Sequence, residues 1–505
     1  MEKLEACPFF IGGEWVRPVA GGTPVFNPST GEIIAECPVG TPAEVEAAVQ
    51  AAHAAFPAWR ETPAVERARL LARFRMLLEE HFEEIVRGNT REHGKTLAES
   101  RGDVKRGLEM IEFALGVPSL LMGEILPDIA RGIDCDAIRH PLGVCVGITP
   151  FNFPAMVPLW MYPVAIACGN TFVLKPSEKV PLTAIKIARL LEQAGLPPGV
   201  LNLVHGGRAV VDALLTHPLV RAISFVGSTP VARHVYETGT RHGKRVQANG
   251  GAKNHVVIMP DADIENSTRG VIEAAFGCAG ERCMAGSAAV VVGGAEKTFL
   301  PALIESARNL RVGPTDRTAQ PDMGAVITGQ HRDRVLALID AGVSEGAKIP
   351  ADGRRVRVSE APGGFYVGPT VLDHVNPGMK VAHEEIFGPV LNVLRLDDLE
   401  AAINVVNRSA YGNGASIFTG SGKAAREFKH RVNCGMIGIN IGVPASMAWF
   451  PFNGWSESFF GDLHMQGREG VQFFTRQKVT TSRWFDPGEG DIWHREPARK
   501  NGSNP

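Results

Sequence analysis

The stretch Phe225-Val-Gly-Ser-Thr-Pro230 decides the fold class, because a buried strand ends in it and a helix begins in it. The apolar run 222–226 predicts the strand, Ser228 is a favoured helix N-cap, and Pro230 suits the first helical turn. A strand followed directly by a helix is the repeating unit of a parallel sheet covered by helices. The N–H groups at such a helix start also suit a pyrophosphate. The alternative is a well-capped helix with no ligand.

The alternation of short apolar runs and helical runs extends from about residue 143 to 260 and predicts a parallel, doubly wound sheet. A second α/β stretch runs from about 264 to 440, and the tail from 465 has a strand-like pattern. The predicted strands are 144–148, 171–174, 200–204, 222–226, 256–259, 471–474 and 479–481, and the predicted helices are 42–57, 64–88, 100–116, 183–194 and one from Ser228.

Length and composition point to a multidomain globular enzyme. The chain has 505 residues, 44% hydrophobic residues and a net charge of −2, so nothing favours nucleic acid or a membrane surface as a partner. The segment from Pro141 to Leu174 has no charged residue, but its interior prolines 150, 154, 158 and 163 exclude a single spanning helix. Eight scattered cysteines without a Cys-x-x-Cys pair indicate a reducing compartment and no metal site. With no leader pattern at the N-terminus, we expect a cytoplasmic protein.

Cys283 is the candidate nucleophile, in the segment Phe276-Gly-Cys-Ala-Gly-Glu-Arg-Cys-Met-Ala285. Small residues around it leave room for a substrate carbonyl, and the neighbouring Arg282 would favour the reactive thiolate. Taken alone, a cysteine in a small-residue stretch is more often a buried apolar filler. The rest of the chain has to decide between these interpretations.

Lys175-Pro-Ser-Glu178 follows a predicted strand, so a lysine and a carboxylate are expected at the carboxyl edge of the sheet, where they could bind a ribose diol. The alternative is a solvated turn. No Gly-x-Gly-x-x-Gly fingerprint is present, so an ordinary Rossmann phosphate turn is not predicted.

Five blocks together resemble the aldehyde dehydrogenase superfamily over nearly the whole chain, from about Phe10 to Trp484. They are Thr149-Pro-Phe-Asn-Phe-Pro154, Thr171-Phe-Val-Leu-Lys-Pro-Ser-Glu178, Phe225-Val-Gly-Ser228, the Cys283 segment and Glu384-Glu-Ile-Phe-Gly-Pro389. The resemblance implies the α/β aldehyde dehydrogenase fold. It places a Rossmann-like NAD domain at 1–124 and 147–256, an α/β catalytic domain at 257–440, small oligomerisation strands at 125–146 and 465–490, and a flexible tail at 491–505.

The same resemblance implies that Cys283 attacks an aldehyde carbonyl, with the Asn152 side chain and the Cys283 backbone N–H as the oxyanion hole. NAD is the implied cofactor, and NADP is disfavoured because a carboxylate at 178 would repel a 2′-phosphate. The implied NAD contacts are Thr149, Phe151, Lys175, Glu178, Lys179, Ser228, Gly250, Glu385 and Phe387.

Asn249 departs from the superfamily pattern, because hydrolytic members carry a glutamate there that activates water. An amide cannot take a proton from water, so a thiol such as that of coenzyme A is expected to release the acyl group. The run Asn249-Gly-Gly-Ala-Lys253 and the closing blocks at 454–464 and 480–484 resemble the CoA-acylating methylmalonate-semialdehyde (malonate-semialdehyde) dehydrogenases. That resemblance implies propionyl-CoA or acetyl-CoA and carbon dioxide as products.

Arg106 and Arg282 match the substrate-carboxylate ligands of that subfamily. Taken alone, Arg106 would be a solvated position beside the apolar stripe of its helix. Two smaller departures are Glu281, where Gln is usual, and Ala232, where Gly is common. Malonate and methylmalonate semialdehyde differ by one methyl, worth about 1–3 kcal/mol in a pocket, so the motifs do not choose between them.

Two alternatives stay open. One is an NAD-dependent dehydrogenase of another acidic semialdehyde that yields the free acid, and the other is a catalytically silent relative. Retention of Cys283, Asn152 and Glu385 argues against the silent relative. The family also implies a homotetramer built as a dimer of dimers, in which the tail strand extends a neighbour's sheet.

Overall fold

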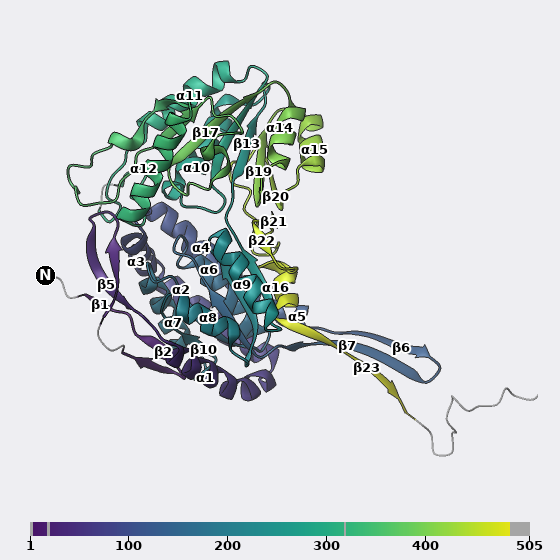
Figure 1. Cartoon of the computed structure of the whole chain (residues 1–505). Helices are drawn as coiled ribbons and strands as arrows, with labels where there is room; N and C mark the ends of the chain where they lie inside the picture. The colour runs from purple at the N-terminus through teal and green to yellow at the C-terminus, as the bar shows by residue number, and fades with distance from the viewer. Residues whose placement is uncertain (1–3, 18–20, 318–319, 485–505) are drawn as a thin grey trace, which may run out of the picture.

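Two α/β lobes lie one above the other, and a long β arm projects from the lower lobe (Figure 1). The computed structural model describes residues 4–17, 21–317 and 320–484. The tail predicted to be flexible, 491–505, lies outside the described residues. Within the described ranges, no helix has both the length and the apolarity needed to cross a bilayer.

The lower lobe contains an eight-stranded sheet in the order β22-β12-β11-β8-β9-β10-β2-β3. The five strands from β12 to β10 are parallel, and the outer strands pair antiparallel. The chain-order direction reverses between β8 and β11. The strand bounds are β2 Phe9–Ile11, β3 Glu14–Val16, β8 Val144–Ile148, β9 Thr171–Lys175, β10 Leu201–Leu203, β11 Val220–Val226, β12 Arg245–Asn249 and β22 Phe459–Phe460.

Helices cover both faces of this sheet, as the predicted doubly wound architecture requires. The charge-free segment 141–174 becomes β8, α6 and β9, and every residue of these three elements except Met156 is buried. The helices are α1 Pro42–Glu61, α2 Ala64–Glu80, α3 Phe82–His93, α4 Leu97–Leu115, α5 Val117–Leu120, α6 Met156–Ala167, α7 Pro181–Gln193, α8 Arg208–Thr216, α9 Thr229–Arg241 and α16 Gly467–Phe473.

The upper lobe contains a seven-stranded sheet in the order β15-β16-β17-β14-β13-β19-β20, parallel except at β15. It is formed by one continuous stretch of chain, which confirms the predicted second α/β unit. Its elements are β13 Asn254–Ile258, α10 Ile264–Phe276, η1 Gly277–Gly280, β14 Gly286–Val292, α11 Glu296–Asn309, α12 Gly329–Ser344, β15 Lys348–Ala351, η2 Gly353–Arg355, β16 Thr370–Asp373, α13 Lys380–His383, β17 Val390–Leu396, α14 Leu399–Asn407, β19 Gly414–Phe418, α15 Gly422–Arg431 and β20 Met436–Ile439.

The arm is a three-stranded antiparallel sheet in the order β23-β7-β6. Its strands are β6 Glu124–Ala130, β7 Ile133–Pro141 and β23 Thr475–Arg483. Two further small sheets contain β1 Glu5–Ala6, β4 Gly22–Asn27 and β5 Glu32–Pro38, and β18 Tyr411–Gly412 and β21 Trp455–Ser456.

Four sequence-based assignments were wrong. Residues 471–474 were predicted as a strand but lie largely in α16, because a short buried apolar run has no periodicity to separate the two. Residues 64–88 form two helices that meet at His81. The strand predicted at 256–259 belongs to the second sheet, because the chain leaves the first sheet at Gly250. Residues 144–146, predicted in the oligomerisation element, belong to buried β8.

Candidate active site

Four predicted site residues lie in a row along the carboxyl edge of the first sheet. Thr149 follows β8, Lys175 ends β9, Ser228 follows β11 and Asn249 ends β12, and these strands are neighbours in the order β12-β11-β8-β9. The Thr149 N–H donates to the Lys175 carbonyl at 3.1 Å. In a doubly wound sheet a ligand binds where the strand order reverses, here between β8 and β11.

Charged and hydroxyl groups at this edge fit a dinucleotide. The Lys175 amine contacts the Glu178 carboxylate at 3.0 Å, and although burial opposes it, the pKa of Glu178 is lowered by Lys175 and its own backbone N–H. Lys179 lies over the Phe151 ring at 4.8 Å. Ser228 is the N-cap residue of α9, as predicted, but its hydroxyl makes no capping hydrogen bond. It therefore remains able to donate to a phosphate.

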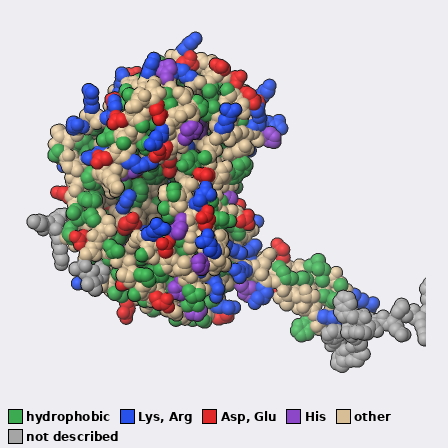
Figure 2. Space-filling view, viewed as in Figure 1, with side chains coloured by type: hydrophobic (Ala, Val, Ile, Leu, Met, Phe, Trp, Pro, Cys, Tyr) green, Lys and Arg blue, Asp and Glu red, His purple; other side chains and the backbone are tan. Residues whose placement is uncertain are grey.

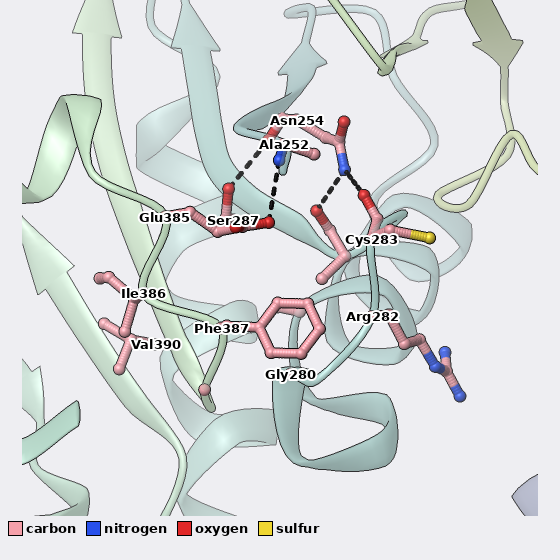
Figure 3. Close-up of a pocket in the computed structure, with 13 residues that line it drawn as sticks. Ala252, Asn254, Gly280, Arg282, Cys283, Ser287, Glu385, Ile386, Phe387 and Val390 are labelled. Carbon is pink, nitrogen blue, oxygen red and sulfur yellow. Dashed lines mark hydrogen bonds between the residues drawn. The ribbon is translucent and has the colours of Figure 1, made fainter. Parts of the chain in front are cut away.

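The Cys283 segment forms a tight turn against the loop that carries Glu385 and Phe387 (Figure 3). Cys278, Ala279 and Gly280 all have positive φ, and a Cβ at Gly280 would lie 2.0 Å from the Gly388 carbonyl oxygen. Only glycine allows this close approach.

Two asparagine side chains hold the backbone of Cys283. The Asn254 and Asn413 amides donate to the Cys283 carbonyl at 2.8 and 2.9 Å, and Asn254 also donates to the Ala285 carbonyl at 2.9 Å. The side chain of Cys283 is half-buried and lines the pocket shown in Figure 3. The backbone that carries the thiol is therefore fixed by residues at the starts of the neighbouring strands β13 and β19.

The thiol of Cys283 is held in its neutral form in the free chain. Burial raises its pKa to about 12, the Glu385 carboxylate adds to the rise, and backbone N–H groups and Arg282 oppose it. Arg282 lowers the pKa of Cys283, as expected, but burial and Glu385 raise it by more. The Arg282 guanidinium instead donates to the Cys278 sulfur at 3.2 Å and lies 3.6 Å from Glu99 of α4.

Asn152 lies next to the Cys283 segment. Its side-chain amide donates to the Glu281 carbonyl at 3.0 Å, and the residue is 4% exposed. A carboxamide has two N–H groups, so this bond fixes the orientation of the amide and leaves a second N–H for an incoming oxygen.

Glu385 and Phe387 complete the pocket. The Glu385 carboxylate accepts from the Ala252 N–H at 2.8 Å, and burial raises its pKa against that bond. Phe387 has a φ of 58° and packs edge-on against Phe151, with ring centroids 5.8 Å apart. A Cβ at Gly250 would lie 2.6 Å from the Glu457 carbonyl oxygen, so the structure gives this glycine a packing role.

Asn249 is 2% exposed, and neither its side-chain oxygen nor its side-chain nitrogen has a protein partner. An unpaired buried amide costs roughly 1–3 kcal/mol, so a ligand or water that bonds to it would be stabilised there. The side chain at this position of the carboxyl edge is an amide and carries no titratable group.

Arg106 and Arg282 both contact acidic side chains of α4. Arg106 donates to Glu109 at 2.9 Å and contacts the Met447 sulfur. Glu99, which pairs with Arg282, precedes Arg106 by two helical turns on the same face, so residues 99 and 106 lie on the order of 10 Å apart along the helix axis. Because both are already paired, a substrate carboxylate must compete with Glu99 and Glu109.

Sequence reasoning missed Lys95, Asn254 and Asn413, whose contacts join segments far apart in the chain. It noticed Glu281 only as an unusual residue, and no local pattern signals the burial of its carboxylate. Among the described residues, no group of three or more His, Cys, Asp or Glu side chains could hold a metal ion.

Comparison with known proteins identifies the family. The aldehyde dehydrogenase family matches residues 15–480. Malonate-semialdehyde dehydrogenase 1 of Oceanobacillus iheyensis is 52% identical over 477 residues, covering 94% of this chain and 98% of that protein. Malonate-semialdehyde dehydrogenase 3 of Geobacillus kaustophilus is 50% identical, covering 96% and 100%.

Solved structures agree. The methylmalonate-semialdehyde dehydrogenase of Oceanimonas doudoroffii has a TM-score of 0.94 at 47% identity, covering 96% of this chain and 99% of that one. A protein from Sinorhizobium meliloti, assigned to the same activity and crystallised with NAD, has a TM-score of 0.95 at 44% identity with the same coverage. The resemblance seen in the motifs is confirmed, and the chain belongs to the aldehyde dehydrogenase family.

Proposed function

We propose that this chain catalyses the NAD-dependent, CoA-acylating oxidation of malonate semialdehyde or methylmalonate semialdehyde to acetyl-CoA or propionyl-CoA with release of carbon dioxide. The names of the similar proteins support the substrate class. The observation that carries the CoA step is the buried, unpaired amide of Asn249, because it leaves no titratable side chain at the position that activates water in hydrolytic members.

The reaction follows from the side chains of the pocket. The Cys283 thiol gives up its proton to solvent and its sulfur attacks the aldehyde carbon. The resulting oxyanion accepts hydrogen bonds from the Asn152 amide and the Cys283 N–H, worth about 3–4 kcal/mol per donor. NAD held at the sheet edge would supply the acceptor for the hydride that leaves this carbon. The thioester on Cys283 has a carboxylate β to its carbonyl, so it can lose carbon dioxide and take a proton at the α carbon. The CoA thiolate then displaces Cys283.

The remaining site residues would hold the substrates. Arg106 and Arg282 would bind the carboxylate of the semialdehyde, for which a guanidinium is chemically suited. For NAD, Lys175 and Glu178 suit the adenine ribose, Ser228 the pyrophosphate and Glu385 the nicotinamide ribose. Thr149, Phe151, Lys179, Gly250 and Phe387 line the same edge and pocket. The similar protein crystallised with NAD supports this cofactor.

We also propose a cytoplasmic homotetramer, a dimer of dimers assembled through the arm. Exposed apolar side chains on β6 and β23 support an interface there. Figure 2 shows hydrophobic side chains along this arm.

The decisive experiment is a stopped-flow trace of NADH with each semialdehyde, without CoA and then with it. Without CoA, we expect a burst of about one equivalent of NADH per active site followed by slow turnover, the signature of an accumulating acyl-enzyme. CoA should restore fast turnover, and Cys283→Ala should abolish the burst while NAD still binds. Equal steady rates with and without CoA would overturn the CoA-acylating assignment.

One observation favours a second candidate function, hydrolysis of the thioester to the free acid. Glu385 lines the same pocket as Cys283, and its raised pKa suits a general base. If Glu385 activates water, turnover without CoA would be steady and Glu385→Gln would abolish it. If the CoA-acylating proposal holds, Glu385→Gln would weaken NAD binding and leave the ratio of rates with and without CoA unchanged.

A further inference from the structure

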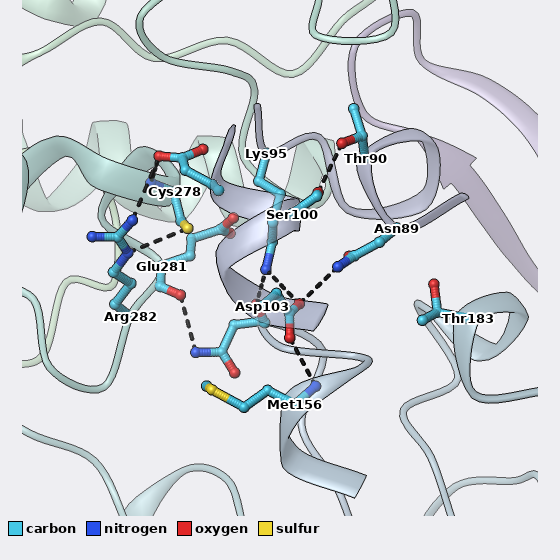
Figure 4. Close-up of polar contacts among 12 residues, drawn as sticks. Asn89, Thr90, Lys95, Ser100, Asp103, Met156, Thr183, Cys278, Glu281 and Arg282 are labelled. Carbon is cyan, nitrogen blue, oxygen red and sulfur yellow. Dashed lines mark hydrogen bonds and ion pairs between the residues drawn. The ribbon is translucent and has the colours of Figure 1, made fainter. Parts of the chain in front are cut away.

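The loop that carries Asn152 is held by a buried ion pair between Lys95, which lies between α3 and α4, and Asp103 of α4. Figure 4 shows Lys95, Asp103 and Met156. The Lys95 amine lies 3.1 Å from the Asp103 carboxylate, and both side chains are fully buried. The same amine donates to the backbone carbonyl of Asn152 at 2.6 Å and lies over the Phe153 ring at 4.2 Å.

Asp103 holds the other end of this loop. Its second carboxylate oxygen accepts from the Met156 N–H at 2.7 Å, at the start of α6. Asn89 of α3 donates to the oxygen that faces Lys95, at 2.8 Å. The ion pair therefore contacts residues 152 and 156 directly, and each partner has further hydrogen bonds.

Stability alone is a weak explanation for such a pair. Moving two charges out of water is costly, and replacing a buried pair by apolar residues is often neutral or stabilising. A role in positioning the loop is a stronger explanation, because oxyanion donors act only within about 2.7–3.1 Å of the developing charge. A displacement of about 1 Å in a reacting geometry can cost roughly 100-fold in rate.

We propose that Lys95 and Asp103 are positioning residues that fix the Asn152 amide for the oxyanion. This inference rests on the proposed role of Asn152, but not on the proposed substrate or on CoA. The contact of Lys95 with Asn152 is to the backbone carbonyl, so Lys95 can affect the oxyanion only by positioning that residue.

The test is a double-mutant cycle read from the NADH burst of the full-length chain with NAD and propanal, without CoA. Lys95→Met should lower the burst rate constant about 10- to 100-fold in the natural chain. In the Asn152→Ala background, it should lower the rate constant less than twofold, because the amide that it positions is gone. Alkylation of Cys283 by iodoacetamide should stay within twofold of the natural chain.

Ser100→Ala is the matched control. It removes a buried 2.7 Å hydrogen bond to Thr90 between α3 and α4, close to Asp103 but without contact to Asn152. We expect its burst rate constant to stay within twofold. If Lys95→Met does not fold, Lys95→Met combined with Asp103→Asn leaves no unpaired buried charge and keeps an acceptor for Met156, and it replaces the single variant in the same cycle.

Three results would overturn the inference. The first is an equal loss from Lys95→Met in both backgrounds, which would show a general structural role. The second is an unchanged burst. The third is a fall in Cys283 alkylation that matches the fall in the burst. If Asn152→Ala itself leaves the burst unchanged, the oxyanion assignment in the proposed function fails as well. Propanal carries no carboxylate and the assay contains no CoA. The double-mutant cycle can therefore be interpreted even if the proposed substrate or the CoA step is wrong.

Discussion

Glu281 places an ionisable group in the core, two residues before Cys283 in the chain. Its side chain is fully buried, and one oxygen accepts from the Ile327 N–H at 3.1 Å while the other has no protein partner. Burial raises the pKa of Glu281 to about 8, against the Ile327 hydrogen bond and nearby lysines. The folded chain therefore holds a proton on this carboxyl at neutral pH.

Glu281→Gln should change how stability depends on pH. Between about pH 5 and 8 the folded state binds one proton that the unfolded state has lost, so this carboxyl destabilises the fold increasingly as pH rises, by at most about 1.4 kcal/mol per unit. The Glu281→Gln variant lacks this pH-dependent destabilisation, so its free energy of unfolding relative to that of the natural chain should increase from pH 5 to 8. Denaturant unfolding midpoints at both pH values measure the change. Glu265→Gln, at an exposed position, is the control, and an equal response in both variants would contradict the prediction.

Asn249→Glu should introduce a base near the thioester and raise the CoA-independent rate. Positioned bases contribute roughly 10²–10⁴-fold, and a smaller gain is expected because the backbone at 250–252 is packed against Glu457 and Glu385. Steady-state NADH formation without CoA measures the gain, and Asn249→Gln is the control that adds length without a titratable group. A glutamate variant no faster than the glutamine variant would show that position 249 does not face the thioester.

Sequence alone nominated Cys283 and Asn249, because five blocks along the chain together resemble one superfamily and both residues stand in runs that can be compared with its pattern. It could not supply Lys95 and Asn413, which reach partners 57 and 130 residues away in the chain. Such contacts exist only once the fold brings the segments together. The contacts of Arg282 could not be predicted either. Its guanidinium contacts Cys278 and Glu99, and not Cys283, its neighbour in sequence.

At the scale of elements, helix α4 contacts both the Arg282 segment of the upper lobe and the Asn152 loop of the lower lobe. Glu99 pairs with Arg282 and accepts from the Cys278 N–H, Asp103 holds the Asn152 loop, and Arg106 lies two turns beyond Glu99 on the same face. The predicted helix at 100–116 was correct in position. Its function was not predictable, because hydrophobic periodicity identifies the buried face of a helix and says nothing about which polar positions meet a site.

Arg106→Leu and Arg282→Leu should each reduce kcat/KM for acidic semialdehydes far more than for propanal. Losing a charge-assisted contact costs about 1.5–3 kcal/mol, or roughly 10- to 100-fold. Arg101→Leu on the same helix is the matched control, because Arg101 is bonded to Glu83 on the surface. If acidic and neutral substrates lose the same factor, these arginines maintain structure and do not bind the carboxylate.

At the scale of the whole molecule, the arm leaves apolar surface in solvent. Leu126 and Val479 are 57% and 64% exposed, and the strand registers place both on one face of the three-stranded sheet. An apolar face on a projecting sheet is typical of a contact surface for another protein chain.

Leu126→Glu combined with Val479→Glu should therefore reduce the oligomeric mass of the protein. Two carboxylates on the arm face would have to be buried without partners in an interface, which weakens association strongly. Light scattering coupled to size exclusion measures the mass, and Thr480→Glu, on the opposite face of the same strand, is the control. An unchanged mass in the double variant would show that this face is not an interface.

The order of segments along the chain has a consequence for synthesis. The upper sheet uses only residues between β13 and β20, so all its strands have been made before the ribosome reaches β22 and β23. The lower sheet needs β22 to cover β12, and the arm needs β23 to pair with β7, more than 300 residues upstream. Pairings over such separations close slowly, and domains generally fold as units during translation. The upper lobe is therefore free to fold first, whereas β12 and β7 stay unpaired on one edge until the chain is nearly complete.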